Sequence, residues 1–146
     1  MYSSVHAATG AIIVAASPDP ITGLALAFVS HFLLDYIGES SIGTIKETAI
    51  IEGILLVIYL LACCITSNPW LYIAAWVASN LPDLIDKPNR ILRGKKEWFS
   101  CHNGEGFFKY KGRKLGYPTV VQLTKDETLT INVASTLYFL LIACFL

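Results

Sequence analysis

Charged side chains are scarce in this chain. Asp, Glu, Lys and Arg make up 15% of its 146 residues, whereas 54% are hydrophobic. A soluble globular domain carries about 25% charged residues, and a disordered chain is poor in hydrophobic ones, so this composition argues against both classes. The mean hydropathy of +0.55 favours a membrane protein, and the length suits a single domain.

Cysteine and N-terminal basic residues are scarce as well. There are four cysteines, and Cys63 and Cys64 are adjacent, which does not suggest the disulfide framework of a secreted domain. A secretory signal peptide begins with a basic region, whereas no Lys or Arg precedes the first apolar stretch of this chain. We therefore expect this stretch to be kept as part of the fold.

Apolar stretches separated by clear breaks predict an all-α fold, a polytopic membrane bundle of four or five helices in one domain over residues 1–146. They lie at about residues 5–16, 21–37, 48–66, 70–86 and 128–146. At about 1.5 Å per residue the first covers only ~18 Å, less than the ~30 Å of hydrocarbon, so it either tilts across or is re-entrant. Pro18-Asp19-Pro20 and Asn68-Pro69 mark turns between helices.

Positive charge is concentrated in one segment. Residues 87–127 hold ten of the eleven Lys and Arg residues and four acidic ones, a net charge of +6, against −6 for the rest of the chain. Because short loops rich in Lys and Arg stay in the cytoplasm, we expect a cytoplasmic basic loop and a location in the cytoplasmic membrane. A β-hairpin is expected near Lys111-Gly112-Arg113, with residues 120–123 as a candidate partner strand.

This orientation brings the candidate site residues to one membrane face. The stretches 21–37 and 70–86 would end on the cytoplasmic side, and 48–66 would begin there. His31 lies four residues deeper than Asp35 on one helix, and Glu52 lies five residues deeper than Glu47 on the next. At about 1.5 Å per residue each is ~6 to 8 Å further into the membrane, so they could meet at one depth. We expect a cluster drawn from His6, His31, Asp35, Glu39, Glu52, Asp83, Asp86 and His102.

His31 and Asp35 are the most informative pair. Their i, i+4 spacing puts an imidazole and a carboxylate on one helix face, which supplies two ligands of a metal site. Ionisable groups in an apolar span are costly unless they pair, face a polar cavity or bind something. The alternative is a hydrogen bond within the helix. For Glu52 the alternatives to a functional role are a lysine partner or a protonated carboxyl group.

Asp83 and His102 are the other prominent candidates. Asp83 ends the helix at 70–86, where a carboxylate opposes the helix dipole and a compensating cation is expected; turn chemistry beside Pro82 is the alternative. His102 lies in a glycine-containing turn, where a histidine either binds a ligand or titrates in solvent.

Four short motifs, taken in order, resemble the predicted membrane-bound metal-dependent hydrolases related to zinc-dependent phospholipase C and to single-strand-specific zinc nucleases. The motifs are His6-Ala7-Ala8-Thr9-Gly10, Ser30-His31-Phe32-Leu33-Leu34-Asp35, Leu81-Pro82-Asp83 and the later His102. The resemblance implies that His31 and Asp35, and by analogous motif Asp83 and His102, bind zinc for phosphoester cleavage. In this chain the Ser-His-x-x-x-Asp element precedes the Pro-Asp element, whereas many members have the reverse order. Gly38-Glu39 stands where they have Pro-His.

Zinc suits such a donor set. It binds nitrogen and oxygen ligands, and an open position holds a water that becomes a nucleophile near pH 7. We expect one to three divalent ions, zinc or else manganese. The ligands of first choice are His31, Asp35, Asp83 and His102; His6 and Glu39 are second choices, and Glu52 and Asp86 are further ligands or catalytic groups such as a general base.

The basic segment indicates the substrate class. Aromatic residues alternate with Lys and Arg between Trp98 and Tyr117, a composition that suits an anionic headgroup surface. The candidate contacts to substrate phosphate are Arg90, Arg93, Lys95 and Lys96. These charges could also serve topology alone, and single-stranded nucleic acid is the less favoured partner.

The sequence therefore predicts a membrane-bound metal-dependent phosphoesterase that acts on a lipid or lipid-linked substrate. The alternative is a non-enzymatic membrane adaptor or transport-like protein whose polar residues are structural or bind an ion.

Overall fold

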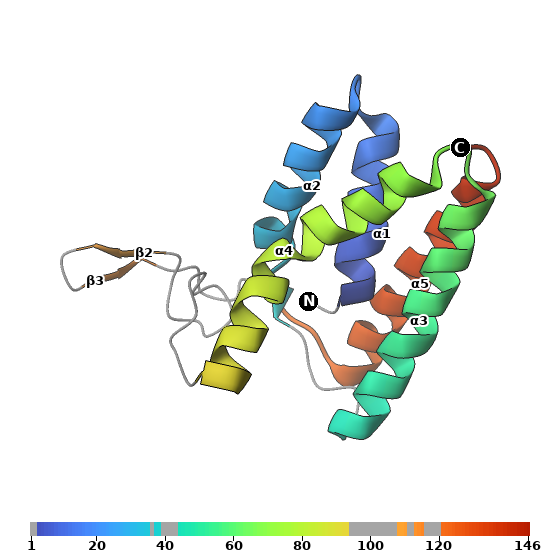
Figure 1. Cartoon of the computed structure of the whole chain (residues 1–146). Helices are drawn as coiled ribbons and strands as arrows, with labels where there is room; N and C mark the ends of the chain where they lie inside the picture. The colour runs from blue at the N-terminus through green and yellow to red at the C-terminus, as the bar shows by residue number, and fades with distance from the viewer. Residues whose placement is uncertain (1–2, 36, 39–43, 94–107, 111–112, 116–120) are drawn as a thin grey trace.

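Five helices form the described part of the chain (Figure 1), which confirms the all-α prediction. The computed structural model describes residues 3–35, 37–38, 44–93, 108–110, 113–115 and 121–146. The helices are α1 (Ser3–Ala16), α2 (Pro20–Asp35), α3 (Ile45–Ile65), α4 (Pro69–Arg93) and α5 (Lys125–Ala143). The strands are β1 (Ile37–Gly38), β2 (Phe108–Tyr110), β3 (Arg113–Leu115) and β4 (Val121–Gln122).

The helices begin where local chemistry satisfies their free N–H groups. The Asp19 carboxylate accepts hydrogen bonds from the Thr22 backbone N–H (2.9 Å) and hydroxyl (2.7 Å), and Pro20 follows in the first turn of α2. Helices α3 and α5 each start with a capping box, Thr44 with Glu47 and Thr124 with Glu127.

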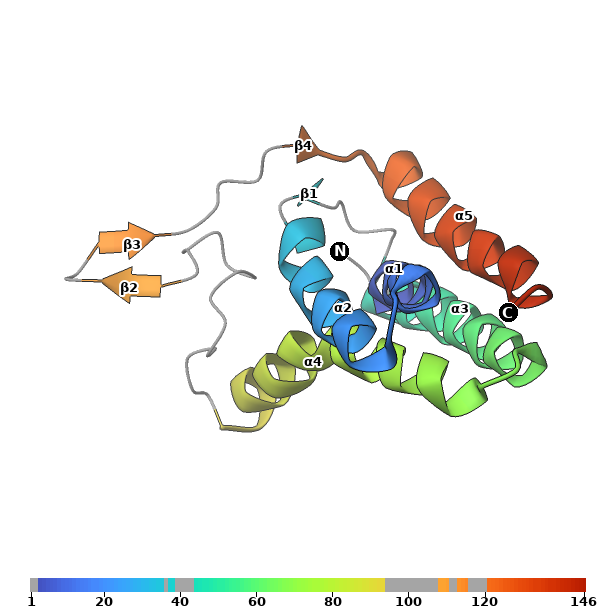
Figure 2. The same cartoon turned by 90° about the horizontal axis from the view of Figure 1, so that it is seen from above.

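Helix α4 is longer than predicted. It continues to Arg93, so residues 87–93 are helical and the predicted end at residue 86 is wrong. The loss of hydrophobicity after Asp86 marks the end of an apolar surface, whereas Lys and Arg are good helix formers. Figures 1 and 2 show that α4 changes direction partway along, as expected for a helix with Pro82 in its interior.

The short strands match one expectation and correct another. Strands β2 and β3 pair as an antiparallel hairpin with Tyr110 opposite Arg113, as predicted; Lys111 and Gly112 lie outside the described residues. Strand β4 pairs in parallel with β1, Ile37 opposite Val121, and not with the hairpin. The pairing of β4 with β1, the strand that follows Asp35, could not be foreseen, because strands of two residues carry no periodic signal.

Helix α1 lies at the centre of the bundle and packs against the other four helices (Figure 2). Its buried face is built from small residues, including Ala7, Ala8, Gly10 and Ala11, which allow neighbouring backbones to approach closely. The start of α1, the end of α2, the start of α3, the end of α4 and the start of α5 lie toward one end of the bundle (Figure 1). The helix ends that carry the predicted site residues therefore lie toward one end of the bundle.

Besides a core of buried apolar side chains, the bundle has exposed large apolar side chains and buried polar ones. Large apolar side chains are exposed on α2, α3, α4 and α5, among them Leu33 (63%), Leu61 (61%) and Leu141 (67%). The fully or nearly fully buried polar side chains include Ser4, His6, Ser30, His31, Ser79, Asn80, Asp83, Asp86, Thr128, Asn132 and Thr136. Within the described ranges, one segment, Lys46–Ile65 of α3, is long and apolar enough to cross a membrane; α1 and α2 are apolar but shorter.

Candidate metal centre

Two histidines from neighbouring helices converge on one carboxylate. His6 Nε2 on α1 lies 3.3 Å from Asp35 Oδ1, and His31 Nε2 lies 3.1 Å from Asp35 Oδ2. The predicted i, i+4 contact between His31 and Asp35 on α2 is confirmed. One ligand atom from each residue lies within 4.8 Å of the other two, so the three side chains surround a single point.

The site is closed to solvent. Both histidines are fully buried and the Asp35 side chain is 7% exposed. The imidazole rings are stacked, with centroids 4.1 Å apart and planes at 21°. Two imidazolium ions at this distance would repel strongly in a medium of low dielectric, whereas the carboxylate between them favours one positive charge. The arrangement therefore accommodates a proton or a metal cation at its centre.

A backbone carbonyl fixes the orientation of His31. His31 Nδ1 lies 2.7 Å from the carbonyl oxygen of Ser79 on α4. Because a carbonyl only accepts, Nδ1 must carry the hydrogen, which directs the other ring nitrogen, Nε2, toward Asp35. Histidines that bind metals usually donate their second N–H to a carbonyl or carboxylate in this way.

The spacing is compatible with a small divalent ion and equally with charge-assisted hydrogen bonds. The two imidazole Nε2 atoms lie 3.3 Å and 3.1 Å from different Asp35 oxygens, and one ligand atom from each residue lies within 4.8 Å of the other two. Ligand atoms that lie about 2.0–2.1 Å from a tetrahedral zinc are about 3.3 Å apart. Two nitrogens and one carboxylate oxygen form a donor set common in catalytic zinc sites, where three protein ligands leave one position open.

Helix α4 carries two more of the predicted residues near this end. Asp83 (5% exposed) and Asp86 (fully buried) follow Ser79 by one and two helical turns. In the part of the chain that the structure describes, the three-residue group contains His6, His31 and Asp35 without either of them. Their assignment as a ligand and a catalytic group stays a prediction.

Glu52 contacts the first turn of α1. Its Oε2 accepts a hydrogen bond from the Ser4 backbone N–H (3.2 Å), and Ser4 Oγ lies 2.9 Å from both Glu52 Oε1 and Asn132 Oδ1. Asn132 Nδ2 in turn donates to the Thr128 carbonyl (2.7 Å). A carboxylate at a helix N-terminus accepts an otherwise unpaired N–H and complements the helix dipole. Glu52 therefore joins α3 to α1, and its catalytic assignment stays a prediction.

The remaining candidates lie where the structure gives no side-chain placement. His102, Glu39, Lys95 and Lys96 are outside the described residues, and the side chains of Arg90 and Arg93 on α4 are outside them as well.

Several buried polar residues were missed at the sequence level. Ser79 and Asn80 interrupt the apolar stretch of α4, and Thr128, Asn132 and Thr136 recur every four residues on α5. Such a polar stripe on an otherwise apolar helix indicates a face that points into a bundle. The stripe is visible in the sequence, although the partner of each residue is not.

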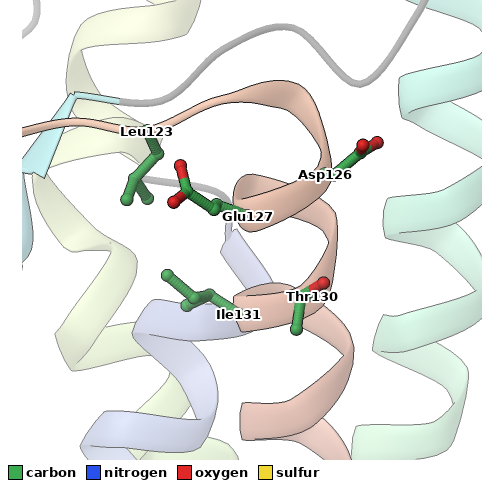
Figure 3. A pocket seen from close by; sticks show the side chains of 5 residues that line it. All are labelled: Leu123, Asp126, Glu127, Thr130 and Ile131. Carbon is green, nitrogen blue, oxygen red and sulfur yellow. The ribbon is translucent and has the colours of Figure 1, made fainter.

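A surface pocket of about 310 Å³ opens beside the start of α5. It is lined by Leu123, Asp126, Glu127, Thr130 and Ile131, with Leu123, Glu127 and Ile131 pointing to one side (Figure 3). The Glu127 carboxylate accepts hydrogen bonds from the N–H and hydroxyl of Thr124, which hold its pKa below the ordinary value. The lining of the pocket contains none of the candidate ligands.

Comparison with known proteins gave no relative. No protein-family model, no curated protein and no solved structure matches the chain.

Proposed function

We propose that this chain is a polytopic membrane protein that binds a divalent metal ion, zinc or else manganese, between His6, His31 and Asp35. We further propose that it is a metal-dependent hydrolase that cleaves a phosphoester in a lipid or lipid-linked substrate. The observation that carries the proposal is the convergence of two buried imidazoles on one carboxylate.

The side-chain distribution supports a membrane location. A bilayer favours apolar side chains on the outer surface and requires polar ones to pair inside, which is the pattern on α2 to α5. Helix α3 has the length and hydropathy of a span. Helix α1, only 14 residues long, is covered by the other four helices, so it does not need to match the bilayer thickness by itself.

The donor set supports hydrolysis. A bound divalent ion supplies a Lewis acid for phosphate oxygens and lowers the pKa of water toward neutrality. Asp35 lies within 3.3 Å of both imidazoles and balances the charge of the centre. Ser79 keeps the His31 ring in the tautomer that directs Nε2 inward. Asp86, two turns beyond Ser79 on α4, is the candidate base.

The position of the site supports an amphiphilic substrate. The centre lies toward the end of the bundle where α4 continues into the basic segment. A lipid held in the bilayer presents its phosphate at this depth, and Arg90, Arg93, Lys95 and Lys96 would each contribute ~1 kcal/mol toward an anionic membrane surface.

The test uses protein purified without a histidine tag. Metal content is measured first, and the protein is then incubated with phospholipid in mixed micelles, with a short soluble phosphodiester and with single-stranded DNA. We expect headgroup release that stops with a chelator and returns with zinc or manganese, and that is lost in Asp35→Asn. Turnover of the soluble diester or DNA without activity on any lipid would contradict the lipid assignment.

A non-enzymatic role is the second candidate, and one observation favours it. His6 and His31 are fully buried, so a substrate phosphate has no open path to them in this conformation. A membrane adaptor or transport-like protein with a structural or ion-binding centre would retain its metal and show no turnover on any of the three substrates.

A further inference from the structure

We infer that the segment of α4 around Ser79 positions the histidines of the proposed metal centre. Gly10 on α1 makes this possible, because the absence of a side chain lets α4 pack close to α1. The inference rests on the proposed function where it is tested by zinc affinity. A second measurement, the protonation of His31 Nδ1, depends only on the hydrogen bond to Ser79 and needs no metal.

At Gly10, helix α1 packs tightly against α4. A Cβ atom at Gly10 would lie 2.9 Å from Ser79 Cβ, 3.0 Å from Ser79 Oγ and 3.0 Å from the carbonyl oxygen of Ala75. Two of these atoms belong to the backbone or to a Cβ, which cannot move without moving the helix. Any side chain at position 10 therefore pushes α4 away from α1.

The same residue of α4 holds the metal ligand on α2. The Ser79 carbonyl accepts the His31 Nδ1–H at 2.7 Å, so a displacement of α4 by a few tenths of an ångström lengthens this bond. Pro82, three residues later, cannot donate to the carbonyl of Ala78, and α4 bends in this region (Figures 1 and 2).

The segment also contacts the first turn of α1, which carries the other histidine. Asn80 Nδ2 lies 3.4 Å from the Ser3 carbonyl oxygen, and Trp76 Nε1 lies 3.4 Å from Ser3 Oγ. Ser3 precedes His6 by three residues, so the two lie on one face of α1. Residues 76–80 of α4 thus set the positions of both imidazoles relative to each other.

The test compares Gly10→Ala with Gly53→Ala. A Cβ at Gly53 on α3 meets no atom within 4 Å, so the control makes the same chemical change without a clash. Loss of an outer hydrogen bond to a metal ligand weakens binding about 10- to 100-fold. We expect this loss in Gly10→Ala, measured by zinc competition titration on protein of unchanged helix content, and unchanged affinity in Gly53→Ala.

A compensating change provides the rescue. Ser79→Gly removes the Cβ and Oγ that Gly10→Ala would meet while keeping the carbonyl that His31 uses. The double variant should recover a large part of the affinity, which a general loss of stability would not. If Gly10→Ala does not fold, Ser79→Thr adds one methyl group at the same contact and should weaken binding in the same direction.

Nitrogen NMR of the His31 ring separates the two proposals. In metal-free wild-type protein we expect His31 to carry a hydrogen on Nδ1, and in Gly10→Ala we expect a fraction of the rings to lack it. If the wild type binds no metal but its His31 ring still differs from that of Gly10→Ala, the proposed function is overturned and the positioning role is supported. Gly10→Ala protein that keeps both the wild-type zinc affinity and the Nδ1–H form overturns the inference.

Discussion

At the scale of single residues, Asp35 decides the chemistry of the centre. Its two oxygens face different histidines, His6 on α1 and His31 on its own helix. The carboxylate is therefore shared between two imidazoles stacked at 4.1 Å, and its negative charge offsets a positive charge on either ring. The three residues should behave as one unit under mutation.

Removal of either member of the α2 pair should abolish the site. His31→Ala and Asp35→Ala are each expected to lose most of the bound metal, and the double variant should be little worse than either, because both side chains belong to the group proposed to hold one ion. Elemental analysis of tag-free protein measures this. Asp126→Ala, which changes an exposed carboxylate, is the control and should keep its metal. Full metal content in both single variants would show that His31 and Asp35 form only a hydrogen bond within the helix and do not bind metal.

Asp19 offers a pH-dependent test away from the site. Hydrogen bonds from the N–H and hydroxyl of Thr22 favour the ionised carboxylate and lower the pKa of Asp19 from 3.8. A group whose pKa is lowered by folding stabilises the fold above its unfolded pKa and loses that contribution as the pH falls through the folded value. Asn keeps the cap without the charge.

We therefore expect Asp19→Asn to lower the Tm at pH 7. The difference from wild type should shrink below about pH 4, as the wild-type carboxylate becomes protonated. Thermal unfolding in detergent, followed by circular dichroism from pH 7 to pH 2, measures both. A difference that stays constant over this range would show that the charge of Asp19 does not contribute.

The sequence predicted half of the centre. The spacing of His31 and Asp35 depends only on helix geometry, so it could be read directly. His6 was a weaker candidate because its partner lies on another helix, and no local pattern specifies which helices touch. The Ser79 carbonyl could not be predicted at all, since a backbone atom leaves no mark in the sequence.

At the scale of the elements, the end of the bundle opposite the metal centre has an aromatic cluster of its own. Tyr59 on α3 stacks on Phe139 of α5 with centroids 4.9 Å apart, and Tyr72 of α4 lies 5.7 Å from the same ring. The Tyr59 hydroxyl donates to the Tyr72 carbonyl (2.7 Å). This cluster joins three helices.

Truncation of the central ring should therefore separate stability from metal binding. Phe139 is fully buried, and Phe139→Ala is expected to cost about 3–5 kcal/mol of unfolding free energy through the cavity it leaves. The matched control is Phe145→Ala, since Phe145 is 90% exposed; a change within about 0.5 kcal/mol is expected there. Chemical denaturation in micelles measures both. Loss of metal from folded Phe139→Ala protein would show that the two ends are coupled.

Element boundaries were predicted best where a proline follows the capping residue. Asp19-Pro20 and Asn68-Pro69 gave the starts of α2 and α4 within a residue. The starts of α3 and α5 were placed at residues 48 and 128, three residues late, because the capping boxes of Thr44 with Glu47 and of Thr124 with Glu127 were not recognised. The end of α4 was misplaced because the change from apolar to basic residues at Asp86 was interpreted as a helix end. The helix continues to Arg93, since a helix can leave an apolar environment without unwinding.

At the scale of the whole molecule, the bundle carries large apolar side chains on its exterior and buries polar side chains beside an apolar core. The composition predicted apolar helices, but which helix is central depends on packing. Helix α1 takes that place because Ala7, Ala8, Gly10 and Ala11 present little volume to four neighbours. Small residues let neighbouring helix backbones approach closely. The short length of α1 and its many small residues are visible in the sequence and favour a central position.

The orientation of this bundle is the prediction on which the lipid assignment depends. The α3–α4 turn at Ser67 and the end of α4 lie at opposite ends of the bundle (Figure 1), and the net charge of +6 on residues 87–127 should hold the second end in the cytoplasm. In a background without cysteine, Ser67→Cys should react with an impermeant thiol reagent added to intact cells, and Lys95→Cys only after the membrane is opened. Ser67 is exposed, so its failure to react would indicate location and not burial. The reverse pattern would place the metal centre toward the outer face, and the substrate would then have to come from the outer leaflet.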